Sequence, residues 1–218
     1  MITYNPPLHN SLDILFKDEY LIIINKPSGL LSVPGRGEDK HDCLISRIQT
    51  EYSDALIVHR LDMSTSGLMV IARGKELERS LSILFQNRKV NKKYIAIVDG
   101  KVKPDHGEIN FPLITDWPNR PKQKIDFTSG KSSQTQYSAL SYDEENNTSR
   151  IELTPLTGRT HQLRLHMQAI EHAILGDELY ANKNAVEKAP RLLLHARYLS
   201  FKHPISGEFI EFYSEPEF

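Results

Sequence analysis

Short hydrophobic runs separated by polar turns predict β-strands along most of the chain. The first two, Ile14–Phe16 and Leu21–Ile24, flank a polar turn at residues 17–19. The segment Lys93–Val98 alternates its side chains between two apolar faces, with Tyr94 on one of them. Further strands are predicted at residues 68–72, 135–140 and 150–154, and as a pair around the turn at 204–207.

Hydrophobic residues at helical spacing predict three helices between these strands. One spans the i, i+4, i+7, i+8 pattern of Leu77, Leu81, Leu84 and Phe85, and a second lies near residues 41–52. A third begins near Thr160, a candidate N-cap. Its apolar stripe is formed by Leu163, Met167 and Ile170. A separate polar face carries His161, Arg164 and Gln168.

Strands dominate this pattern and helices interrupt them irregularly. That order favours an α+β fold with a mainly antiparallel mixed β-sheet, flanked by helices and loops. No Ser/Gly-rich linker divides the chain. We therefore expect an N-terminal arm over residues 1–11 and a single domain over residues 12–218.

Composition and charge narrow the classes of function. The 218 residues are 39% hydrophobic and 25% charged, and their net charge of −1 argues against a nonspecific nucleic-acid coat protein. Local basic strips are present, however: residues 88–93 form one, and Arg120, Lys122 and Lys124 form another after Trp117. Such strips on a neutral protein suit a selective RNA enzyme, because phosphate contacts need only local positive potential.

Cysteine usage and the N-terminal residues indicate the compartment. Cys43 is the single cysteine, so no intrachain disulfide is possible, and no basic and apolar secretory signal is visible. The apolar run at residues 21–24 is too short to span a bilayer. We expect a cytoplasmic protein without membrane attachment. His161 and His166 lack the i, i+4 spacing of a zinc helix, so no metal site is predicted.

Two dense segments carry the candidate chemistry. Asp62 lies in the run His59-Arg60-Leu61-Asp62, just before a Ser/Thr/Gly turn that can lift its carboxylate out of the scaffold. The second segment, residues 157–166, offers basic groups to pair with that acid.

These segments, with four others in the same order, resemble the RluA family of pseudouridine synthases over nearly the whole chain. The others are residues 23–30, 92–96, 174–177 and 192–196. The stretch Trp117–Lys124 is similar to the RluA subgroup, whose members have a similar length. Larger relatives carry an N-terminal S4 module, and none is expected here because the first motif starts near residue 13.

The resemblance implies a pseudouridine synthase fold with an active-site cleft across the sheet. It implies an isomerase that breaks the N-glycosidic bond of uridine, turns the uracil and rejoins it through C5, without a cofactor or metal. The implied partners are stem-loops of large-subunit ribosomal RNA and the anticodon stem-loop of transfer RNA. No protein partner is implied, and a monomer is expected.

The resemblance also assigns roles to individual residues. Asp62 is the essential carboxylate, and Arg164 its guanidinium partner, with Arg159 as a rival. Tyr94 is expected to stack on the uracil and to assist proton removal from C5. Leu165 is a candidate apolar wall beside the base, or simply a core residue.

The remaining predicted residues contact RNA. Arg60 is expected to fill the space that a flipped uridine leaves, because a guanidinium stacks on bases and binds phosphate. His59 is expected either to orient Asp62 or to pack, and Lys26, Arg120, Lys122 and Lys124 are expected to bind RNA. The alternative is a noncatalytic RNA-binding module, which leaves the Asp62 segment unexplained.

Overall fold

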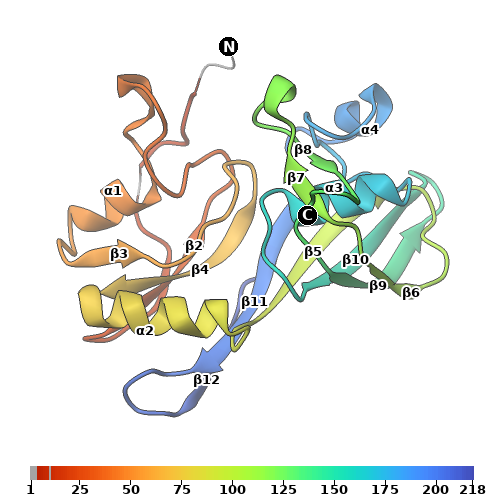
Figure 1. The fold of residues 1–218 in the computed structure, drawn as a ribbon. Helices are drawn as coiled ribbons and strands as arrows, with labels where there is room; N and C mark the ends of the chain where they lie inside the picture. Colours follow the sequence, from red (N-terminus) through yellow and green to blue (C-terminus); the bar gives the residue numbers. More distant parts are fainter. Residues whose placement is uncertain (1–3, 10) are drawn as a thin grey trace. The chain divides into compact units, whose positions relative to one another are not determined.

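The computed structural model describes residues 4–9 and 11–218. The chain forms two compact units (Figure 1). The first unit runs up to Lys92 and resumes over His195–Glu217, and the second covers Lys93–Leu194 with Phe218. Each unit has its own hydrophobic core of buried side chains.

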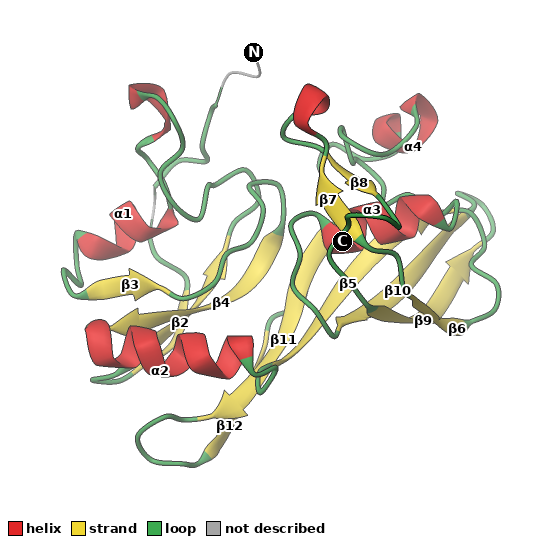
Figure 2. Cartoon of the chain, viewed as in Figure 1, coloured by secondary structure: helices red, strands yellow, loops and turns green. Residues whose placement is uncertain are grey.

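Strands outnumber helices in the described chain, and Figure 2 shows both kinds of element in each unit. The strands are β1 (Ile14–Lys17), β2 (Leu21–Lys26), β3 (Ala55–Ile57), β4 (Ser66–Arg73), β5 (Asn91–Asp99), β6 (His106–Ile109), β7 (Leu113–Thr115), β8 (Gln123–Ile125), β9 (Thr135–Asp143), β10 (Thr148–Pro155), β11 (Leu194–Lys202) and β12 (Phe209–Tyr213). The helices are α1 (Leu44–Gln49), α2 (Lys75–Gln86), α3 (Gln162–Ala169) and α4 (Lys183–Glu187), with 3₁₀ turns at Glu38–Lys40 and Trp117–Asn119.

The sheet of the first unit is built around β4, which is buried along nearly its whole length. Strand β2 runs antiparallel to it, with Leu21 opposite Ala72 and Lys26 opposite Gly67. Strands β1 and β3 extend this antiparallel arrangement. Strand β11 joins β4 in parallel, with Ala196 opposite Gly67, and β12 pairs with β11 antiparallel.

Gly67 is required where β4 meets β11. Its φ is 115°, in the region that favours glycine, and a Cβ at this position would lie 2.4 Å from the carbonyl oxygen of Ala196. The turn after Asp62 therefore leads directly into a strand junction that only glycine fits.

Helix α2 is amphipathic, as the sequence predicts, and its apolar side covers one face of this sheet. Leu77 and Leu81 are buried in the core of the first unit, beside Val70 and Phe201. Helix α1 is shorter than the predicted segment 41–52, because a reciprocal cap between Cys43 and Ser46 starts it at Leu44.

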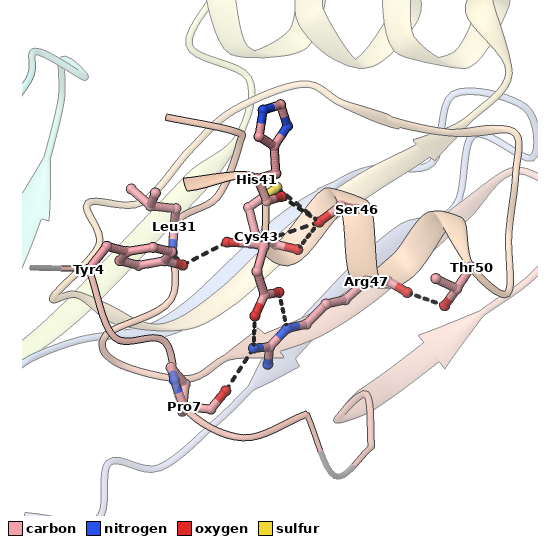
Figure 3. A network of polar contacts seen from close by, with 9 residues as sticks. Tyr4, Pro7, Leu31, His41, Cys43, Ser46, Arg47 and Thr50 are labelled. Carbon is pink, nitrogen blue, oxygen red and sulfur yellow. Dashed lines mark hydrogen bonds and ion pairs between the residues drawn. The ribbon is translucent and has the colours of Figure 1, made fainter. Parts of the chain in front are cut away.

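The described part of the N-terminal arm is hydrogen-bonded to the rest of the first unit (Figure 3). The Tyr4 hydroxyl donates to the Asp42 carbonyl and accepts from the Leu31 amide, at 2.8 and 3.1 Å. Arg47 donates to the Pro7 carbonyl at 2.7 Å and forms a two-pronged ion pair with Asp42. That pair lowers the pKa of Asp42, although burial opposes the shift. Residues 1–3 and 10 of the predicted arm lie outside the described residues.

The second unit holds an antiparallel sheet in the order β5-β10-β9-β6 and a separate hairpin of β7 and β8. Helix α3 packs its apolar stripe, including Leu163 and Met167, into the core beneath this sheet. It begins at Gln162, so the prediction of Thr160 as the N-cap is wrong. His161 takes that position in the left-handed conformation, with φ 54°, and makes no side-chain capping bond.

The pairing of these strands confirms the predicted fold class. Within each unit the described strands pair antiparallel, except for the parallel junction of β4 and β11. The strands predicted at both ends of the chain are present, and so is the long helix α2. Across the described residues, every helix is too short or too polar to cross a bilayer.

Candidate active site

Asp62 lies on the connection between β3 and β4, residues 58–65, which we call the Asp62 loop. Lys26, the last residue of β2, is completely buried behind it. Its ammonium group donates to the carbonyl oxygens of Pro27, Leu30 and Met63, at 2.8, 2.8 and 3.2 Å. The charge of a buried lysine is thus stabilised by main-chain dipoles, and one of them belongs to the residue that follows Asp62.

A second set of bonds holds the Asp62 loop from residues 27–32, which we call the bracing loop. The hydroxyls of Ser32 and Ser28 donate to the carbonyls of Leu61 and Ser64, both at 2.8 Å. The Gly29 amide donates to the Met63 carbonyl at 2.8 Å. Main-chain groups on both sides of Asp62 are therefore fixed, and its half-buried carboxylate is carried on a rigid support.

His59 anchors the start of the Asp62 loop. Its Nε2 accepts a hydrogen bond from the Val70 amide at 3.1 Å, and its ring stacks on Phe85 with centroids 4.5 Å apart. Burial lowers the pKa of His59 to about 3, and the nearby charge of Lys92 contributes to the same shift. The imidazole is neutral at physiological pH, and its acceptor role at Nε2 places the ring proton on Nδ1.

Arg164, on α3 in the second unit, is held by a buried carboxylate. Its Nε and Nη2 donate to the two oxygens of Asp177 at 2.8 and 2.6 Å, and the side chains are 5% and 1% exposed. Asp177 also accepts from the amides of Leu179 and Tyr180. This paired geometry fixes the plane of the guanidinium.

The turn that presents Asp177 depends on the glycine before it. Gly176 has φ 70°, and a Cβ there would lie 1.9 Å from the Arg191 carbonyl oxygen. No other residue fits so close an approach. Gly176 therefore sets the path of the chain that brings Asp177 to Arg164.

Tyr180 is a second residue that contacts Arg164. The Arg164 guanidinium carbon lies 5.3 Å from the centre of the Tyr180 ring, within the range of a cation–π contact. The Tyr180 hydroxyl accepts from the Gln123 amide at 2.8 Å and lies 2.8 Å from Nδ1 of His161. One tyrosine thus contacts Arg164 with its ring, and β8 and the residue preceding α3 with its hydroxyl.

The hairpin formed by β7, the turn at Trp117–Asn119 and β8 (residues 113–125) is the basic hairpin. At its tip, the Arg120 guanidinium lies 4.8 Å from the Trp117 ring, and Trp117 is 67% exposed. Arg120 and Lys124 are exposed, Lys122 is half-buried, and Lys124 has Asp126 within 4.0 Å. Positive charge beside an exposed indole is a combination that binds single-stranded nucleic acid.

Comparison with known proteins decides the family. The family model described as RNA pseudouridylate synthase matches residues 20–169. The chain belongs to the RNA pseudouridylate synthase family. It is 49% identical over 218 residues to the dual-specificity RNA pseudouridine synthase RluA of Escherichia coli strain K12, covering 100% of this chain and 99% of that protein. The RluA of Vibrio parahaemolyticus is 52% identical over 209 residues, covering 94% of this chain and 84% of that protein.

A solved structure agrees with these relatives. Human RNA pseudouridylate synthase domain containing 1 superposes with a TM-score of 0.80 at 27% identity, covering 97% of this chain and 86% of that one. The predicted family, the pseudouridine synthase fold and the isomerase activity are confirmed, and the alternative of a noncatalytic RNA-binding module is not supported. The protein is an RNA pseudouridine synthase.

In this family context, the predicted residues fall into both units. Asp62, His59, Arg60 and Lys26 belong to the first, whereas Tyr94, Arg164, Leu165 and the basic hairpin belong to the second. Arg60 is exposed, and Tyr94 is half-buried on β5 beside the core. Leu165 is buried at 6% exposure on α3, in accord with core packing. Arg159, the rival to Arg164, donates to the Ser132 carbonyl at 3.2 Å.

Lys26 and His59, two of the residues predicted beside the RNA, make contacts within the protein. Lys26 is fully buried with its ammonium group on main-chain carbonyls, so it supports the Asp62 loop instead of reaching a phosphate. His59 holds the start of the same loop through its bond with the Val70 amide. Both residues thus make hydrogen bonds with main-chain groups that hold the Asp62 loop in place.

Asp177 and Tyr180 contact Arg164, and sequence reasoning assigned neither of them a role. Asp177 is part of a segment that resembles the family, and the Gly-Asp pair is a sign of a tight turn presenting a carboxylate. Tyr180 carries no comparable signal, because a tyrosine in a loop has no period to identify it. Among residues 4–9 and 11–218, no three His, Cys, Asp or Glu side chains gather as they would around a metal ion.

Proposed function

We propose that this enzyme isomerises uridines in stem-loops of large-subunit ribosomal RNA and in the anticodon stem-loop of transfer RNA. The observation that carries the proposal is the 49% identity, over the full length of the chain, to an RluA with dual specificity. We further propose that it works in the cytoplasm as a monomer without a protein partner, and that residues 12–218 form one catalytic domain. Selection by loop shape is how proteins usually recognise folded RNA.

The chemistry proposed for Asp62 follows from the difference between substrate and product. The N1–C1′ bond breaks, a C5–C1′ bond forms, the proton on C5 leaves and N1 gains a proton, so the product is an isomer and needs no co-reactant. A carboxylate assists this exchange best when it is ionised and held in place. The bonds from Lys26 and Ser32 to the residues around Asp62 support this assignment.

Arg164 and Tyr94 are proposed to act with Asp62 in the same reaction. A guanidinium stabilises an ionised carboxylate and fixes its orientation. The buried pairing with Asp177 supports this role, because it holds Arg164 in one geometry while leaving its charge permanent. Tyr94 is proposed to stack on the uracil and to assist removal of the C5 proton, and Leu165 to bound the base on its apolar side.

Arg60 and the basic hairpin are proposed to hold the RNA. The exposed Arg60 would occupy the stack after the target uridine leaves it, a step that costs a few kcal/mol. Arg120, Lys122 and Lys124 would contact phosphates, and the Trp117 indole would stack on an unpaired base. The exposure of Trp117 and its contact with Arg120 support this reading.

The test of the proposed function is Asp62→Asn, in purified enzyme and in cells that lack the wild-type gene. We expect loss of pseudouridine formation with RNA affinity largely kept, because the amide keeps the size of the carboxylate and removes its charge. Mapping pseudouridines in ribosomal and transfer RNA, with and without the gene, identifies the substrates. A map unchanged by deletion would overturn the proposal.

The flipping role of Arg60 has a separate test. Arg60→Ala is expected to reduce turnover of a folded stem-loop more than turnover of an unstructured oligonucleotide that contains the same uridine, because only the folded RNA has a stack to refill. Equal losses on the two substrates would contradict the role. Lys89→Ala, an exposed basic residue of the same unit, is the matched control.

A further inference from the structure

The geometry points to Tyr180 as a positioning residue that fixes the guanidinium of Arg164 and connects it to the basic hairpin. This inference rests on the proposed function, in which Arg164 acts in catalysis and the hairpin holds RNA. It adds a residue outside the matched range 20–169, in a segment for which the sequence suggested no role.

Arg164 is restrained in two directions. Asp177 holds the edge of the guanidinium through two charge-assisted bonds, which fix its plane and its rotation within that plane. The Tyr180 ring faces the guanidinium carbon at 5.3 Å, which limits movement out of the plane. The two restraints are themselves joined, because the Tyr180 amide donates to the Asp177 oxygen that binds Nη2 of Arg164.

The Tyr180 hydroxyl extends this arrangement to the hairpin. It accepts from the main-chain amide of Gln123, the first residue of β8, which lies between Lys122 and Lys124. It also bonds Nδ1 of His161, next to the first turn of α3. A hydroxyl has one hydrogen and two lone pairs, so it can serve both partners at once. Because the bond is to the backbone of β8, any displacement of the hairpin acts directly on the tyrosine ring.

The functional consequence is that engagement of RNA by the hairpin sharpens the orientation of Arg164. Small errors in the placement of a charged group reduce turnover strongly, even where binding is unchanged. Removal of the hydroxyl should therefore reduce kcat while KM stays nearly constant. A tyrosine that only filled space would show no such division.

The experiment compares Tyr180→Phe with the wild type in single-turnover and steady-state assays on one stem-loop RNA. The phenylalanine keeps the ring over Arg164 and deletes the hydroxyl's bonds to Gln123 and His161. We expect kcat to fall about tenfold, as for loss of one net hydrogen bond, with KM changed by less than about twofold. Tyr142→Phe is the matched control, because it deletes a hydroxyl bonded to Asn147 at 2.9 Å in the same unit. We expect it to retain wild-type kcat.

A double-mutant cycle tests the link to the hairpin. In a Trp117→Ala background the hairpin's hold on RNA is weakened, so Tyr180→Phe should then cost about threefold or less in kcat, which would show coupling between the two positions. Equal costs in both backgrounds would overturn the link. The positioning role would be overturned if Tyr180→Phe kept a wild-type kcat. It would also be overturned if the melting temperature of Tyr180→Phe were lower than that of Tyr142→Phe by enough to account for the lost activity. If the wild-type enzyme makes no pseudouridine, it is the proposed function that fails instead.

Discussion

The supports of Asp62 and Arg164, one in each unit, differ in kind. The Asp62 loop is held mainly through its own backbone, whose carbonyls accept from Lys26, Ser28 and Ser32. Arg164 is held by the side chains of Asp177 and Tyr180. The first support fixes where the chain runs, and the second fixes how one side chain points.

This difference determines which substitutions each support tolerates. Several separate donors hold the backbone of the Asp62 loop, so the loss of one leaves the others in place. The Arg164 support includes a buried charge pair with Asp177, and removal of Asp177 takes away two charge-assisted bonds in a low-dielectric site. The two regions therefore differ in the size of effect expected from single substitutions.

The largest effect is expected for Asp177→Ala. It removes the carboxylate that accepts from Nε and Nη2 of the buried Arg164, and it should lower the free energy of unfolding by about 3–5 kcal/mol. Chemical denaturation at neutral pH measures this change. The control is Glu187→Ala, which removes a partner of Lys183 from an ion pair whose side chains are 88% and 66% exposed. It should change stability by less than about 0.5 kcal/mol, and similar losses in the two variants would show that burial does not govern this pair.

Lys26→Met is expected to have the next largest effect. The methionine fills the same space, but it leaves the carbonyls of Pro27, Leu30 and Met63 without the ammonium donor. We expect the free energy of unfolding to fall by about 2–3 kcal/mol, because charge-assisted bonds are lost while the cost of burying the charge is also removed. Lys75→Met is the control, since that side chain is 82% exposed. A Lys26 variant as stable as the control would contradict the supporting role.

The same comparison explains how much of the site could be predicted from sequence. Asp62 lies in a run of distinctive residues, so resemblance to the family is enough to identify it. The spacing of apolar residues in α2 predicts the buried face of that helix directly. The burial of Lys26 could not be predicted in that way. An isolated lysine at a strand end usually reaches solvent, and only tertiary structure places three carbonyls around its ammonium group.

The contacts that hold Arg164 are even harder to predict from the sequence. Residues 164, 177 and 180 share no helix or strand, and their contacts depend on the path that Gly176 permits. The sequence predicts the start of α3 near Thr160, whereas the helix begins at Gln162, because His161 adopts a left-handed conformation that is uncommon for residues other than glycine. Local patterns predict elements well, whereas contacts between loops depend on the completed fold.

Two histidines with lowered pKa values offer a third comparison between the units. The folded protein holds the pKa of His59 at about 3 against an ordinary value of 6.5, and burial also lowers the pKa of His166 in the second unit. Between these two values of pH the unfolded chain takes up a proton that folded His59 does not. Stability therefore falls as the pH falls from 6.5 towards 3, by up to about 1.4 kcal/mol per pH unit.

The histidine prediction is tested by denaturation at several pH values. His59→Gln keeps an acceptor for the Val70 amide but does not titrate, so it should flatten the acid decline in stability, and His166→Gln should flatten it in the same direction. The exposed His106→Gln serves as the control and should leave the decline unchanged. An acid decline that His59→Gln does not reduce would show that the ring is protonated as readily in the folded protein as in the unfolded chain.

The smallest effect is expected on the salt dependence of RNA affinity, when basic residues are removed from the basic hairpin or from the strip after α2. Arg120 and Lys122 lie in the basic hairpin, whereas Arg88 and Lys89 are exposed after α2. If only the hairpin contacts phosphates, Arg120→Ala with Lys122→Ala should reduce the dependence of log affinity on log salt by about 1.4, at about 0.7 for each single-strand contact. Arg88→Ala with Lys89→Ala removes the same charge and should leave the slope nearly unchanged. Binding titrations of one stem-loop at several salt concentrations measure both slopes. Equal reductions would mean that RNA is recognised by overall positive charge, and the assignment of the RNA contact to the hairpin would then be wrong.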